Sequence, residues 1–303
     1  MSPKLRPWQL IVLIAVLCAA AVGGVVWHRA GALTTAALLK RLPTEDALVV
    51  YVDFSALRRA GILQLLDGSK TGEDPDYQTF VRRANLDYQR DLDTALVAFA
   101  PTGKFMLLRG RFDWDSLRAY VAAEHGRCEG SLCRVVGSAA ERRISFFPLQ
   151  AGLMALAVSP DASAALRLRT PVPATDLELP DAPIWLSIPG AVLRGESLPT
   201  GTRPFARSME RARSVTLSFV PEGNRLAARL NVRCVDERDA VQVASQLSDT
   251  TNLLRSLIER EHQKPNPADL SGVLTAGAFR SEGRRVIGYW PIERVFVENL
   301  LGR

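Results

Sequence analysis

The chain has little of the material from which catalytic or metal centres are built. Among 303 residues there are only three histidines and four cysteines. The motifs HExxH, GxSxG, GxxxxGK[ST] and GxGxxG do not occur, which argues against zinc proteases, α/β-hydrolases, P-loop enzymes and Rossmann dehydrogenases. Gly103-Lys104 lacks the earlier glycine and the Ser or Thr of a phosphate loop, and is typical of a hairpin turn. We therefore predict no catalytic residues, no cofactor and no metal ligands, and we favour binding over catalysis.

Lysine is also scarce, and most of the basic residues are arginines spread along the chain. No block of Lys and Arg is interleaved with aromatic residues, so the net charge of +6 gives little support for nucleic-acid binding. The composition is otherwise ordinary, with 47% hydrophobic and 23% charged residues. It fits a folded body of one large or two ordinary domains.

Charge is absent from one long stretch, WQLIVLIAVLCAAAVGGVVW, between Trp8 and Trp27. As a helix it would span about 30 Å, the thickness of the hydrocarbon core of a bilayer. The two tryptophans would mark its ends at the lipid headgroups. We predict that residues 1–29 form an uncleaved signal anchor, a transmembrane helix whose partner is the lipid bilayer through residues 8–27.

Two other readings of this segment remain open. Ala19-Ala20-Ala21 offers a signal-peptidase site, although the apolar run continues beyond it. Acylation of Cys18 ranks third, because Leu17 precedes it rather than a small residue.

The orientation of the segment follows from the charges that flank it. The positive charges are nearly balanced on the two sides of the apolar stretch, and a short N-terminal tail usually stays in the cytoplasm. We therefore expect a single-pass protein of the inner (cytoplasmic) membrane, with residues 30–303 extracytoplasmic.

The cysteines allow one disulfide. Cys128 and Cys133 enclose Gly130-Ser131, which permits a tight turn. In an oxidising compartment the pair can close a small loop, and the alternative is two free thiols. A metal site would need two further ligands, and the nearest histidine stands alone.

Similar patterns occur twice along the chain. Phe99-x-Pro101-x-Gly103 matches Phe219-x-Pro221-x-Gly223 at an offset of 120, each between two β-rich runs and before a helix opened by aspartate. We expect an α+β fold in which the N-terminal transmembrane helix is followed by two similar units with antiparallel sheets, produced by internal duplication. The units would stand side by side or share one continuous sheet. The expected domains are 40–168 and 184–303, joined by a proline-rich linker over 169–183.

Weaker patterns suggest a few contact residues. The loop from Asp67 to Asp76 fits a calcium-binding loop poorly, because Gln78 stands where a bidentate Glu is needed. A cluster of carboxylates, Asp87, Asp91 and Asp93, could do acid–base chemistry, but Asp at a helix end before a strand is usually a cap or turn residue. Trp114 opens a helix and is the best single aromatic candidate for a binding contact.

The segments VVYVDFSALRRAG and YQRDLDTALVAFAPTGKFMLLRGRFD resemble uncharacterised membrane-anchored bacterial proteins, of acidobacterial type, that carry domains of unknown function. The resemblance covers most of residues 40–170 and implies an envelope location and no catalytic residues. We expect a binding or scaffold module of the bacterial cell envelope, with an envelope protein as one candidate partner. The alternative is an envelope hydrolase or lipid-handling enzyme with a site between the two domains.

Overall fold

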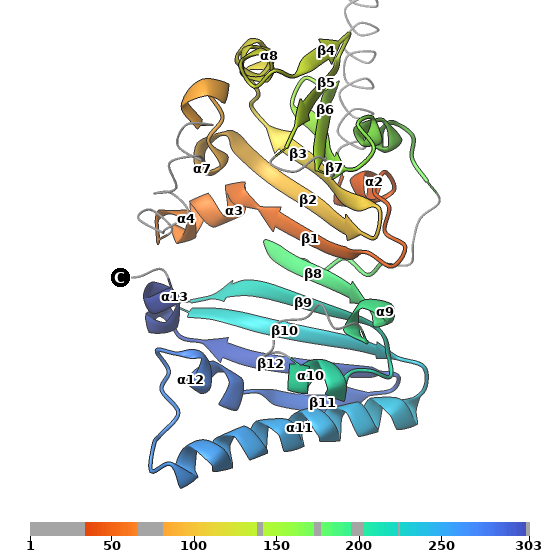
Figure 1. Ribbon diagram of the computed structural model, residues 1–303. Coiled ribbons are helices and arrows are strands. Elements are labelled where there is room, and N and C mark those ends of the chain that lie inside the picture. Colours follow the sequence, from red (N-terminus) through yellow and green to blue (C-terminus); the bar gives the residue numbers. More distant parts are fainter. Residues whose placement is uncertain are drawn as a thin grey trace, which may run out of the picture.

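The structure is a computed structural model that describes residues 34–65, 81–137, 142–172, 177–194, 203–223 and 225–300. Its strands all belong to one antiparallel sheet of 12 strands (Figure 1). They are β1 (Leu48–Asp53), β2 (Leu92–Ala100), β3 (Gly103–Gly110), β4 (Arg127–Glu129), β5 (Leu132–Val136), β6 (Arg143–Gln150), β7 (Leu153–Ser159), β8 (Ile184–Pro189), β9 (Ala212–Glu222), β10 (Arg225–Cys234), β11 (Ala278–Glu282) and β12 (Arg285–Ile292). Their order across the sheet is β11-β12-β10-β9-β8-β1-β2-β3-β7-β6-β5-β4.

The helices pack against both faces of this sheet. They are α2 (Thr35–Leu39), α3 (Phe54–Arg59), α4 (Ile62–Leu65), α7 (Tyr88–Asp91), α8 (Trp114–Ala123), the 3-10 helix η1 (Ala164–Arg169), α9 (Gly190–Leu193), α10 (Arg203–Ser208), α11 (Glu237–Arg260), α12 (Leu270–Thr275) and α13 (Arg294–Leu300). Two of them begin at predicted aspartate caps: Asp113 accepts a hydrogen bond from the Ser116 amide, and Asp236 accepts one from the Asp239 amide.

The first and second parts of the chain meet at the centre of the sheet. There β1 pairs with β8 over four residues of each strand, from Val49–Ser187 to Val52–Ile184. The predicted fold class, an N-terminal transmembrane helix followed by two similar units with antiparallel sheets, is therefore wrong, because the described strands form one large antiparallel sheet. A continuous sheet was the arrangement that the sequence left open beside separate units. The α+β character is correct. Within the described part of the chain no helix is long and apolar enough to span a bilayer, and the stretch from Trp8 to Trp27 lies outside that part.

The two hairpins that prompted the prediction of a repeat lie at corresponding places in the strand order, but their turns differ. Pro101 lies in the turn between β2 and β3, whereas Pro221 lies inside β9. Gly103 has φ of +141°, and a Cβ there would lie 2.6 Å from the Val158 carbonyl oxygen, so this turn requires glycine.

Hydrophobic clusters cover different faces in the two parts of the sheet. On one face, Leu96 and Leu107 pack with residues of α2 and η1 and with Trp185 of β8. On the opposite face, which we call the front face and which Figure 1 presents to the viewer, Val215 and Val232 pack beneath α11. Also on the front face, residues of α8 pack against β5, β6 and β7. The front face of the middle strands therefore lies between two helix-covered areas, one beneath α11 and one beneath α8.

Candidate functional site

An apolar row crosses the front face of the sheet perpendicular to the strands. Successive cross-strand neighbours from β10 to β6 are all hydrophobic: Leu230, Leu217, Leu186, Val50, Val97, Met106, Leu156 and Phe146. Directly paired side chains lie on the same face of an antiparallel sheet, so these eight form one line.

A second apolar row runs parallel to the first, two residues further along each strand. It begins at β12 and consists of Trp290, Ala228, Phe219, Ile184, Val52, Ala95, Leu108 and Met154. Neither row contains a polar side chain between the α11 cluster and the α8 cluster.

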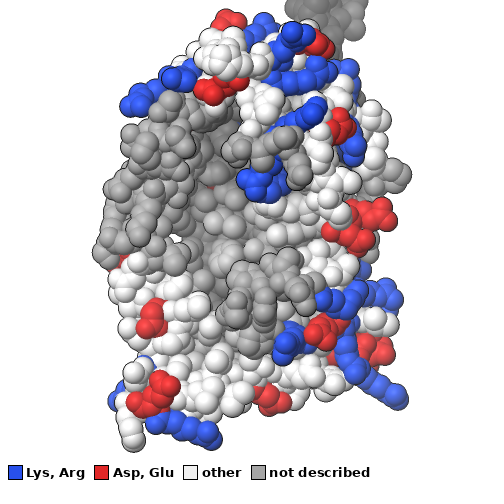
Figure 2. Space-filling view, in the orientation of Figure 1, with Lys and Arg blue, Asp and Glu red and all other residues white. Residues whose placement is uncertain are grey.

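The ends of the rows are buried, but their middle is not. Leu230 is 4% exposed and Met154 2%, each within a hydrophobic cluster. Eight side chains between them are only half-buried, and we call them the apolar trough: Leu217, Phe219, Ile184, Leu186, Val50, Val52, Val97 and Met106. Figure 2 shows a hollow in the middle of this side of the molecule, and among the described residues Lys, Arg, Asp and Glu lie mainly around the margin.

The reverse face of the same region is built differently. On β9, Thr216 and Ser218 alternate with the trough residues and point to the back, as does Ser187 on β8. Two of these polar side chains are buried, since Ser187 is 2% exposed and Ser218 is 7% exposed. Leu217 packs against the cluster beneath α11, whereas the other seven trough residues belong to none of the hydrophobic clusters. The trough is therefore a surface suited to apolar contact.

One lysine stands at the hairpin end of the trough. Lys104 precedes Met106 by two residues on β3 and therefore lies on the front face. Its Nζ lies 5.8 Å from the centroid of the Phe99 ring, and Phe99 is 40% exposed. No described carboxylate forms an ion pair with Lys104. A cation thus adjoins the apolar surface.

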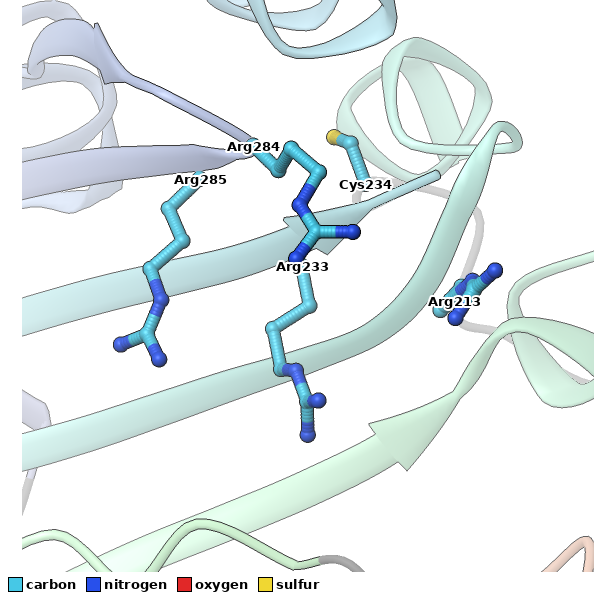
Figure 3. A pocket seen from close by; sticks show the side chains of 5 residues that line it. All are labelled: Arg213, Arg233, Cys234, Arg284 and Arg285. Atoms are coloured by element: carbon cyan, nitrogen blue, oxygen red, sulfur yellow. The ribbon is translucent and has the colours of Figure 1, made fainter. Parts of the chain in front are cut away.

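A second feature is a small cavity rich in arginine. It has a volume of about 130 Å³ and is lined by Arg213, Arg233, Cys234, Arg284 and Arg285 (Figure 3). We call it the arginine cavity. Burial raises the pKa of the Cys234 thiol, so the cysteine stays protonated and neutral near pH 7.

A larger groove adjoins the arginine cavity and shares Arg213 and Arg233 with it. Its volume is about 340 Å³, and its lining includes three acidic residues, Glu45, Asp46 and Glu178, beside Ser187, Ser214 and Thr216. The groove lies where β8 and β9 of the second part meet the segment that leads into β1 of the first.

The predicted carboxylate cluster is used for structure. Asp91 is 9% exposed and binds Arg90 at 2.9 Å and Arg111 at 3.4 Å. The hydrogen bond from Arg90 is the largest effect that lowers the pKa of Asp91, and the Asp87 amide donates a further one. Asp87 caps α7 through the Gln89 amide, while Asp93 lies half-buried in β2. The three carboxylates therefore do not form a shared site.

The other predicted residues lie apart from both features. Trp114 is partly buried against the α8 cluster, with its ring 5.7 Å from that of Phe112. Cys128 and Cys133 face each other across the β4–β5 hairpin and are joined in the structure by a bond of 2.01 Å between their sulfur atoms. Trp8, Trp27 and the loop from Asp67 to Asp76 lie outside the described residues.

Sequence reasoning missed both the trough and the arginine cavity. Trough residues occur in five strands whose pairing cannot be read from local alternation. The signal for the cavity was weak as well: of its four arginines, only Arg284 and Arg285, directly after a turn glycine, are adjacent in sequence. Among the described residues, no group of three His, Cys, Asp or Glu is placed to hold a metal ion.

Comparisons with known proteins give a distant likeness in structure. No family model and no curated protein matches the chain. Crystal form I of TP0453 matches with a TM-score of 0.48 and 10% identity, over 86% of this chain and 95% of that one. Form III gives 0.47 and 10% over 86% and 96%, and form IV gives 0.45 and 11% over 88% and 96%. With TM-scores below 0.5, these likenesses carry no argument about function.

Proposed function

We propose that this chain is a membrane-attached, extracytoplasmic binding protein of the bacterial envelope whose apolar trough holds the acyl chain of a lipid. The observation that carries the proposal is the pair of uninterrupted apolar rows, left half-exposed over five central strands. The uncharged stretch from Trp8 to Trp27 supports attachment to a bilayer, which would keep the protein close to lipid.

The dimensions and chemistry of the trough suit an acyl chain. From β9 to β3 it crosses four interstrand spacings, or about 19 Å at about 4.8 Å each. The side chains of the trough offer no hydrogen-bonding group, so they suit a hydrocarbon chain, which has no donor or acceptor of its own. Each methylene removed from water contributes about 0.8 kcal/mol, and eight buried methylenes would give about 6 kcal/mol before the entropic cost of association.

The trough favours binding over the alternative of a hydrolase or lipid-handling enzyme. It lies between the two parts of the chain, where the enzyme alternative places its site. However, none of the eight trough side chains can act as a nucleophile, general acid or general base. A scaffold that docks an apolar segment of another envelope protein remains the rival, and the experiment below separates the two.

The experiment compares one trough variant with a matched control on the same strand. Leu217→Asn places an amide in the trough, while Val220→Asn places one on the back face of β9; both side chains are half-buried. The body from residue 34 onward would be secreted into a bacterial periplasm, checked for folding by circular dichroism, and examined by native mass spectrometry. Binding of a fluorescent polyene fatty acid would then be titrated.

We expect co-purified lipid on the wild type and saturable binding of the fatty acid. Leu217→Asn should weaken that binding about tenfold, because it removes apolar contact and inserts an amide without a partner. Val220→Asn should leave it unchanged. The proposal fails if the folded wild type binds no lipid, or if both variants lose the same affinity. Specific co-purification of an envelope protein that Leu217→Asn abolishes, without bound lipid, would establish the scaffold instead.

A further inference from the structure

The groove beside the arginine cavity, which we call the junction groove, carries charges of both signs. Its charged lining residues are Glu45, Asp46, Glu178, Arg213 and Arg233. Glu178 is already used for structure, since it binds Arg285 at 2.8 Å and accepts a hydrogen bond from the Asn231 side chain at 3.2 Å. Because the opposite charges largely offset each other, the groove suits a ligand without net charge better than a simple anion or cation.

Hydroxyl groups line the junction groove along the strand register. Ser187 on β8 pairs directly with Thr216 on β9, and Ser214 lies two residues before Thr216, so the three hydroxyls share the back face of the sheet. Ser187 is 2% exposed, and within the described part of the chain its hydroxyl has no hydrogen-bond partner. A buried hydroxyl without a partner costs free energy. A ligand in the groove that bonds to it would remove that cost.

Two carboxylates adjoin these hydroxyls. Glu45 and Asp46 lie in the segment before β1, are exposed, and form no ion pair or hydrogen bond with another described side chain. Ionised carboxylates only accept hydrogen bonds, guanidinium groups only donate them, and hydroxyls do both. The junction groove therefore presents acceptors, donors and groups of dual character to a single ligand.

We propose that the junction groove binds a saccharide. A sugar ring has no net charge, and each of its hydroxyls both donates and accepts a hydrogen bond, as this lining requires. Its C–H groups can contact the apolar residues of the lining, which are Ala47, Leu177 and Pro189. The volume of about 340 Å³ lies within the range of about 300–1,000 Å³ that is usual for small-molecule sites. The groove lies on the face opposite the trough, so the proposal does not depend on acyl-chain binding.

The test uses the full-length chain in an uncharged polyoxyethylene detergent, which contains no sugar. The probes are glucose, galactose, mannose and N-acetylglucosamine, each titrated by saturation-transfer-difference NMR. Ser187→Ala removes the buried hydroxyl. Asp46→Asn removes a charge at a position with φ of +49°, a conformation that asparagine also tolerates.

Ser218→Ala is the matched control. Ser218 is likewise a buried serine of the back face, at 7% exposed, but its hydroxyl donates to the Arg229 carbonyl oxygen at 3.5 Å, and it does not line the groove. Melting temperatures of all the variants would be measured as well. That of Ser187→Ala should not fall, because the lost hydroxyl bonds to no described residue.

We expect at least one of the four sugars to bind the wild type and Ser218→Ala saturably and equally. Ser187→Ala should bind it about fivefold more weakly and Asp46→Asn about tenfold, since hydrogen bonds to ionised groups are the stronger ones. The proposal is overturned if the folded wild type binds none of the sugars, if both groove variants keep full affinity, or if Ser218→Ala loses as much as they do. The acyl-chain experiment is read separately, because it alters Leu217 on the front face.

Discussion

Replacing Trp185 by alanine should loosen the first part of the sheet more than the second. Trp185 belongs to β8, yet its side chain is 1% exposed within the cluster that Leu96 and Leu107 form with α2 and η1. It stacks on Tyr51 of β1 with ring centroids 5.4 Å apart and planes at 20°. It therefore ties β8 to the core of the first part at the junction where β1 and β8 pair.

The expected loss of stability is large. Truncating a fully buried tryptophan to alanine costs about 3–5 kcal/mol through lost contacts and the remaining cavity. A domain's whole stability is typically about 5–15 kcal/mol. Trp114→Ala is the matched control, since Trp114 is only partly buried. We expect this control to lose markedly less stability.

Pulse proteolysis of the full-length protein in detergent over a urea series would measure both losses. Hydrogen exchange followed by mass spectrometry would locate them. Amides of β1, β2 and β3 should exchange faster in the Trp185→Ala variant, while those of β10 and β12 stay protected, because the cluster beneath α11 does not include Trp185. Equal losses for the two tryptophan variants would refute the reasoning, as would uniform loss of protection across the whole sheet.

Four further predictions concern separate features. Asp91→Asn should destabilise the fold near neutral pH and reduce the loss of stability on acidification, as unfolding measured over a pH series would show. The pKa of Asp91 is lowered in the folded state, so the stability that this carboxylate contributes is present above its ordinary pKa of 3.8 and is lost as the pH falls through the folded-state pKa. Non-reduced peptide mass spectrometry of protein made in an oxidising compartment should show Cys128 joined to Cys133, and removing the bridge should cost about 2 kcal/mol in urea unfolding on loop entropy; free thiols would contradict this. Lys104→Gln should weaken binding of a fatty acid but not of the corresponding fatty alcohol, in the same fluorescence titration, because only the acid carries a charge for the ammonium to meet. Attachment through residues 8–27 predicts that full-length protein stays in the membrane pellet through high-salt and carbonate washes, and release by either wash would refute it.

Local structure followed from the sequence wherever neighbouring residues decide it. The turn at Pro101-Thr102-Gly103 and the long helix from Glu237 to Arg260 both carry their own signals, namely turn residues in one case and an aspartate cap with apolar periodicity in the other. The sequence favoured a cap or turn role for Asp87, and in the structure this residue caps the short helix α7. Such features depend on contacts between residues close in the chain.

Tertiary structure alone decided how the strands join. Alternation in β1 and β8 shows that each strand has two faces, but it does not show that Val50 lies beside Leu186, which is 136 positions away. That pairing joins the strands of both parts of the chain into one sheet and aligns the half-buried side chains of the trough. The same long-range register set Arg233 opposite Arg285. Sequence patterns fix which side chains share a face of one strand, whereas partner and register depend on burial summed over the whole sheet.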